Sequence, residues 1–150
     1  MTRQWQLMRD AQTFLDASKL ANDALIGIQF AEIARKEGKC VQKLQMQKID
    51  KGVTLLQTIL RALEAREKGE VTSPEALSVL YVLSQGRMVG GSAYLRKILS
   101  NSLTELDRSK QGKTSDLEEA ENLLEIIANS TSEEATKATS KVQMFMVEAR

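Results

Sequence analysis

A glycine-lysine-threonine triplet at residues 112–114 is the one candidate for chemistry on phosphates. A nucleotide-binding loop also needs an earlier glycine, so that backbone N–H groups point at the phosphates, and a preceding strand. Asp107 occupies the position of that earlier glycine, and the residues before it repeat apolar side chains at a helical period. We therefore expect a helix to end at Gly112 and another to begin with Ser115 as its cap and Glu118 three residues later.

Histidine is absent from the chain, and the single cysteine is Cys40. This composition removes the usual general base, the serine and cysteine triads and nearly all zinc sites. Lysines beside Cys40 could stabilise a thiolate, but without a histidine base we expect a small buried or half-buried side chain. The acidic run at 116–125 lacks the glycine and alternating donors of a calcium loop, so it predicts a solvated helix face. We expect no enzyme activity, metal, cofactor or small-molecule substrate.

Composition is typical of one globular domain over residues 1–150, because 42% of the residues are hydrophobic and 27% are charged. The lone cysteine and an N-terminus without an apolar run favour a reducing, cytoplasmic setting. No apolar run approaches membrane-spanning length, so we expect no membrane contact. Only 4% of the residues are aromatic, which disfavours nucleic-acid binding by base stacking.

Apolar periodicity predicts helices and no strand, so the expected fold is all-α, a compact bundle of five to six helices. Cap, proline and glycine signals place the helices at about 4–36, 39–68, 74–85, 92–110, 116–128 and 130–147. We expect Gly52 to kink the second helix, with Asp50 able to cap a restart, and Gly86, Gly90 and Gly91 to form a turn.

Two details of packing follow from the same patterns. The third helix is apolar nearly all round, which predicts that its segment Glu75–Leu83 is the most buried part of the fold. In the first helix, a core stripe is expected to be widened by four further apolar side chains. These are Leu15, Ile26, Phe30 and Ile33.

Charge is distributed unevenly although the net charge is only +1. Segments 35–51 and 87–113 each carry a net charge of +4, whereas segment 114–135 carries −7. On one helix Lys39, Lys43 and Lys51 would form a row at four-residue steps through Gln47, a geometry able to follow a phosphate backbone. The alternative is that these are ordinary solvated helix faces.

The combination of a short, histidine-free, all-helical chain with basic faces and no catalytic set resembles the small subunits of CRISPR effector complexes. The resemblance covers the whole chain through its length, helical content and charge placement. It implies a subunit packed with other proteins, including further copies of itself, that contacts a nucleic-acid backbone without sequence specificity. The nearly neutral net charge departs from this resemblance, because a surface that lines the path of a nucleic acid is expected to be more basic. The candidate contact residues are Lys36, Lys39, Lys43, Lys48, Lys51, Arg96 and Lys97.

A different class of function fits the chain as well, namely a helical secretion-type chaperone or adaptor that presents an apolar groove to a partner helix. The apolar cluster near the C-terminus favours this alternative, because methionines adapt to varied surfaces. Packing into the core is the more common fate of such a cluster. Its members are Met144, Phe145, Met146 and Val147.

Overall fold

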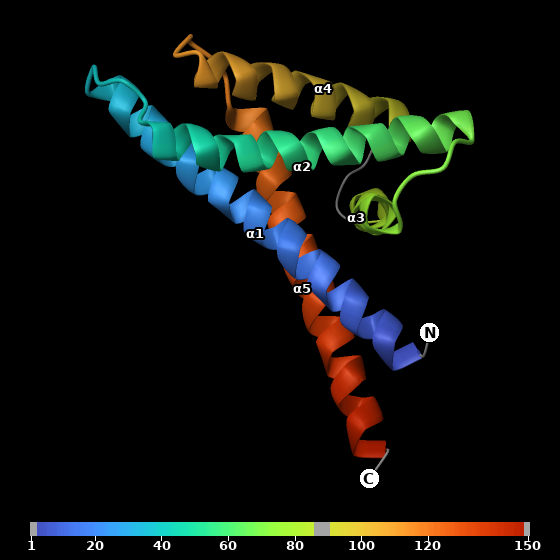
Figure 1. The fold of residues 1–150 in the computed structure, drawn as a ribbon. Coiled ribbons are helices and arrows are strands. Elements are labelled where there is room, and N and C mark those ends of the chain that lie inside the picture. The colour runs from blue at the N-terminus through green and yellow to red at the C-terminus, as the bar shows by residue number, and fades with distance from the viewer. Residues whose placement is uncertain (1–2, 86–90, 149–150) are drawn as a thin grey trace.

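The computed structural model describes residues 3–85 and 91–148 as five α-helices. They are α1 (Arg3–Lys36), α2 (Lys43–Lys68), α3 (Pro74–Gln85), α4 (Gly91–Lys110) and α5 (Glu118–Glu148). No strand occurs in these residues, which confirms the all-α class. In Figure 1, α2 and α4 form an upper layer, α1 and α5 descend together as a lower limb, and α3 lies beneath the C-terminal part of α2.

The central helix is α1, which makes its most extensive contacts with α5 and α2. Its inner face carries small side chains, Ala17, Ala21, Ala24 and Ala31, that are almost or fully inaccessible to solvent. Small residues at a helix interface let the neighbouring backbones approach closely. The core between the five helices is then filled by leucines and isoleucines from α2, α3, α4 and α5.

The helix α3 is not surrounded by the other helices, although apolar residues on nearly every side of it predicted a central position. Leu80 and Leu83 point into the core, but Leu77 and Tyr81 on the same helix are exposed. A helix of twelve residues at the edge of the bundle is covered on one side only. Its start is as predicted, because the hydroxyl oxygen of Ser73 accepts a hydrogen bond from the backbone N–H of Ala76, at 3.2 Å.

Gly52 does not kink α2, which continues without interruption from Lys43 to Lys68. It lies instead where α2 crosses α1, since a Cβ atom built on Gly52 would stand 2.5 Å from the Cβ of Ala24. Gly27 of α1 also lies where the two helices are close, about one turn along from Ala24. A Cβ atom built on Gly27 would stand 2.8 Å from the Cβ of Lys48. Both glycines are explained by close helix packing rather than by a bend.

The connection between α1 and α2 is longer than predicted. Gly38 has a positive φ of 69°, and the N–H of Lys39 donates to the carbonyl oxygen of Ala34 at 2.8 Å, so α1 ends as expected. Residues 39–42 are not helical, and Gln42 is extended with ψ at 156°. The second helix therefore begins at Lys43 and not at Lys39.

The fifth and sixth predicted helices are one helix, α5, which spans Glu118–Glu148. The predicted cap signal near residue 130 is wrong because the hydroxyl of Thr131 finds a partner within the helix. Thr131 donates to the carbonyl oxygen of Ile127 at 2.6 Å, and Ser130 is 9% exposed. The carbonyl oxygen of Ala128 also accepts a bond from Ser18 of α1, at 3.2 Å. Packing on α1 thus keeps α5 continuous through its polar segment.

The triplet at 112–114 lies in the turn between α4 and α5. Gly112 has a φ of 76° and ends α4, as predicted. The cap of α5 is not Ser115, since the Asp116 carboxylate accepts the N–H of Glu118 at 3.1 Å.

Of the three glycines predicted to form a turn before the fourth helix, Gly91 begins α4, whereas Gly86 and Gly90 lie outside the described residues.

We predict that Gly52→Ala lowers the free energy of unfolding by about 1–3 kcal/mol, because the added methyl overlaps Ala24. The gain in helix propensity, about 1 kcal/mol, opposes this loss. Ala24→Gly in the same chain should restore part of the stability by removing the overlapping methyl. Urea unfolding of the two single variants and the double variant measures this coupling, and additive effects would contradict the predicted contact.

Candidate functional site

The basic row predicted along one helix is broken. Lys39 lies outside α2 and pairs with Glu37 at 3.1 Å, and Lys51 pairs with Asp23 of α1 at 3.0 Å. Only Lys43 remains as an exposed member of the row with no acidic partner among the described residues. The row therefore offers fewer cations than its spacing suggested.

The remaining candidate lysines and arginine fall at different places. Lys36 is exposed at the end of α1, and Lys48 is half-buried where α2 meets Gly27. Arg96 forms an ion pair with Glu67 of α2, and the adjacent Lys97 is exposed. Because Glu67 follows Lys43 by about 36 Å along the axis of α2, the two groups of cations do not form one surface.

The first turns of α5 lie beside the last turns of α1, where the carboxyl groups of Glu121 and Glu32 come close to each other. Burial, hydrogen bonding with Glu32 and repulsion by the neighbouring carboxylates raise the pKa of Glu121 to about 7. The predicted solvated acidic face thus includes one half-buried carboxyl that faces another helix. No group of three or more candidate metal ligands is found within residues 3–85 and 91–148.

Cys40 is exposed in the connection between α1 and α2. The prediction of a buried or half-buried residue is wrong because the second helix begins at Lys43, three residues after Cys40.

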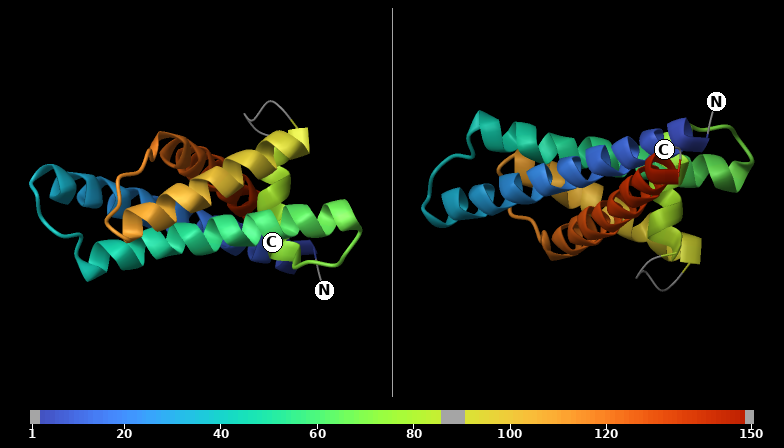
Figure 2. Two further views of the ribbon diagram at one scale, coloured as in Figure 1. Left: turned by 90° about the horizontal axis from the view of Figure 1, so that it is seen from above. Right: turned by 90° about the horizontal axis from the view of Figure 1, so that it is seen from below.

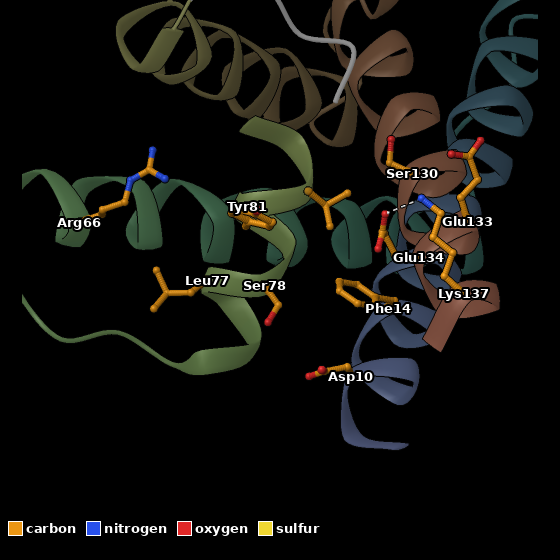
Figure 3. Close-up of a pocket in the computed structure, with 11 residues that line it drawn as sticks. Asp10, Phe14, Arg66, Leu77, Ser78, Tyr81, Ser130, Glu133, Glu134 and Lys137 are labelled. Atoms are coloured by element: carbon orange, nitrogen blue, oxygen red, sulfur yellow. Dashed lines mark hydrogen bonds and ion pairs between the residues drawn. The ribbon is translucent and has the colours of Figure 1, made fainter. Parts of the chain in front are cut away.

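A groove of about 770 Å³ lies between α3 and the limb formed by α1 and α5. Figure 3 shows Phe14 of α1 and Tyr81 of α3 on its two sides, with Leu77 beside Tyr81. Tyr81 is 59% exposed and Leu77 is 38% exposed, so both present apolar surface to solvent. Val82 adds to the apolar floor.

Charged side chains of both signs surround this apolar floor. Asp10 of α1 and Arg66 of α2 line the groove, and Lys137 of α5 pairs with Glu134 at 3.4 Å. An apolar centre with a polar rim is the usual anatomy of a protein-binding surface. The ion pair between Arg9 and Glu75, at 3.0 Å, ties the start of α3 to α1 and fixes one end of the groove.

The α5 side of the groove continues toward the C-terminus. Met144 follows Lys137 by two helical turns and so lies on the same face of α5. Met144, Met146 and Val147 are each more than half exposed, so packing of this cluster into the core is wrong for these three residues. The side chain of Phe145 is outside the described part of the structure.

The groove could not be predicted from the pattern of α3, because apolar residues on nearly every side of that helix predicted burial of Leu77 and Tyr81, which are exposed. Phe14 is buried, as its place in the apolar stripe of the first helix predicts. The available signal was the shortness of α3, since a twelve-residue helix cannot be surrounded by four others over its whole surface.

Comparison with family models, with curated proteins and with solved structures gave no match. None of the described helices combines the length and hydrophobicity needed to cross a lipid bilayer.

We predict that Glu121→Gln stabilises the protein at pH 8 by about 1 kcal/mol and has no effect at pH 4. The folded carboxyl has a pKa of about 7 against 4.5 for an ordinary one, so the folded state holds the proton more tightly. Stability of the unmodified protein should therefore fall as the pH rises from about 4.5 to 7. Urea unfolding across this range measures the effect, with Glu119→Gln on the exposed side of α5 as the control. Equal pH dependence in both variants would contradict it.

Proposed function

We propose that this protein is a non-catalytic adaptor that receives an amphipathic helix of a partner protein in the groove between α3 and the α1–α5 limb. The observation that carries the proposal is the exposed apolar surface of Leu77 and Tyr81, which lines the groove together with Val82 and the buried Phe14 inside a rim of mixed charge. A helix laid in a groove buries side chains at i, i+3, i+4 and i+7. The length of α5 beyond Lys137, with its exposed methionines, extends this surface along one direction.

A helix suits this groove better than a small molecule for two reasons. The groove is open along its length rather than closed, and its polar groups are distributed around the rim instead of converging on one point (Figure 3). Tyrosine is also a residue that dominates binding energy in protein interfaces, and Tyr81 stands at the centre of the α3 side.

Photo-crosslinking tests the groove. A benzophenone amino acid at position 81 should capture one protein in the native host, whereas the same group at Val71, exposed in the α2–α3 connection, should not. The captured segment is then synthesised and titrated into the purified protein.

We expect the peptide to become helical on binding, and Leu77→Ser with Tyr81→Ser to weaken the affinity at least about 30-fold. Val71→Ser should leave the affinity unchanged. Calorimetry and circular dichroism measure both effects. Equal capture at positions 71 and 81, or a segment that stays extended when bound, would contradict helix binding in the groove.

A second candidate function is contact with a nucleic-acid backbone, as the resemblance to CRISPR small subunits implies. The observation that favours it is the group of exposed lysines around the α1–α2 connection, Lys36, Lys39 and Lys43. They lie near the C-terminal end of α4, because Arg35 reaches the hydroxyl of Ser109 at 3.5 Å. This end of the molecule therefore gathers cations from both basic segments, although Glu37 and Asp50 offset part of the charge.

For this candidate we predict that replacing Lys36, Lys39 and Lys43 by alanine flattens the slope of log affinity against log salt by about two to three units. Fluorescence anisotropy with single- and double-stranded oligonucleotides measures the slope. The matched control removes three positive charges near the C-terminal end of α2, at Arg61, Arg66 and Lys68. An equal change in both triple variants would mean that net charge alone acts, and would reject the α1–α2 end as a contact surface.

A further inference from the structure

The central helix α1 has a second apolar stripe on the side that faces away from the core. Met8, Leu15, Ile26 and Ile33 lie on it, and their exposed fractions range from 39% to 56%. They are about half a helical turn away from Ala21, Ala24 and Ile28, which are fully buried. Leu15, Ile26 and Ile33 were predicted to widen the core stripe, and that prediction is wrong. In the right-hand view of Figure 2, α1 is seen along its length between α2 and α5 with no other helix in front of it.

Four polar side chains complete this outer stripe, namely Gln12, Lys19, Asn22 and Gln29, and all four are exposed. Together the eight positions follow one another at alternating steps of four and three residues from Met8 to Ile33. This is the spacing of the a and d positions of a coiled coil. The outer stripe therefore has the pattern of a surface that packs against another helix, although the opposite side of α1 is already buried in the core.

The order of residues in the stripe matches itself when it is read backwards. If α1 of a second copy runs antiparallel, Met8 meets Ile33 and Leu15 meets Ile26. In the same register Gln12 meets Gln29, and Lys19 meets Asn22. Every layer then joins apolar to apolar or polar to polar, and amide side chains can hydrogen-bond across the layers of the second type. A parallel pair would instead place Lys19 against Lys19, two like charges in one layer.

We infer that α1 forms an antiparallel coiled coil with α1 of a second copy of this chain through the outer stripe. The two-fold axis passes between the layers of Lys19 and Asn22. Polar residues at core positions of a coiled coil are known to fix register and partner number at a cost in stability, and half of these layers are polar. The pairing is therefore specific and of moderate strength, with a dissociation constant on the order of micromolar.

The area of the stripe is sufficient for such a dimer. Eight half-exposed side chains of roughly 90 Å² each give about 1,400 Å² over the two copies, within the range of specific interfaces. Phe30 is 52% exposed beside the stripe and adds apolar surface at its edge. The groove lined by Asp10 and Phe14 opens on the opposite side of α1, so dimerisation leaves it accessible. The dimer thus goes beyond the adaptor function and does not depend on it.

Analytical ultracentrifugation of the full chain, between about 1 and 200 µM, tests the dimer. We expect a monomer–dimer equilibrium for the unmodified protein. Leu15→Glu and Ile26→Lys should each weaken it by at least about 100-fold, because the symmetry places each change in two layers. Val71→Glu, an equally polar change at a residue that is 99% exposed elsewhere, should not affect it. Circular dichroism verifies that each variant is folded.

Mixing the two stripe variants tests the register. A mixed dimer contains one copy with Leu15→Glu and one copy with Ile26→Lys. The two changed side chains then face each other in one layer as an ion pair, and the symmetry-related layer keeps the unmodified Ile26 and Leu15. Native mass spectrometry should therefore find mixed dimers where each variant alone is monomeric. A monomer throughout the concentration range, dimers that persist in both variants, or failure of the mixture to pair would each overturn the inference.

Discussion

The close approach of α1 and α2 at Gly52 and Ala24 is the constraint on which the rest of the fold depends. With no side chain on one helix and a single methyl on the other, the two backbones lie close enough for the core to be narrow. Leucines on α4 and α5, together with Ile28 of α1, then fill the space between the helices. An alanine-rich inner face also explains how one helix can have two partners at once, since both α2 and α5 pack on it.

Charge placement shows why segment counts are a weak guide to a surface. Each basic segment meets acidic side chains from another helix, as in the pairs of Lys51 with Asp23 and Arg96 with Glu67. Exposed pairs of this kind add little stability, but they reduce the field that a polyanion would meet. Apolar side chains, by contrast, stay exposed on the groove and on the outer stripe of α1. The described surface is therefore better suited to helices than to phosphates.

Local signals in the sequence predicted the helices well where the backbone alone decides. Gly38 and Gly112 end helices through positive φ, and Ser73 caps α3, and each acts through neighbours within four residues. The same signals failed where packing decides. Thr131 resembled part of a helix start, yet contact with α1 keeps α5 continuous, and the role of Gly52 depends on a residue twenty-eight positions away. The groove was beyond prediction because periodicity identifies an apolar face without saying what covers it.

Pairing of the first helix with the last has a consequence for how the chain folds. The most extensive helix contact joins α1, residues 3–36, to α5, residues 118–148. The chain between these two helices must therefore close into a loop that spans most of the sequence. During synthesis, the inner face of α1 has α2 available early, but its other partner emerges from the ribosome only after the remaining helices. Until then the alanines of α1 and the leucines of α2 remain partly uncovered, a state in which chaperones bind nascent chains. Because the first helix packs on the last, we expect the core to be completed in one late step, when α5 docks on α1, and not gradually during synthesis.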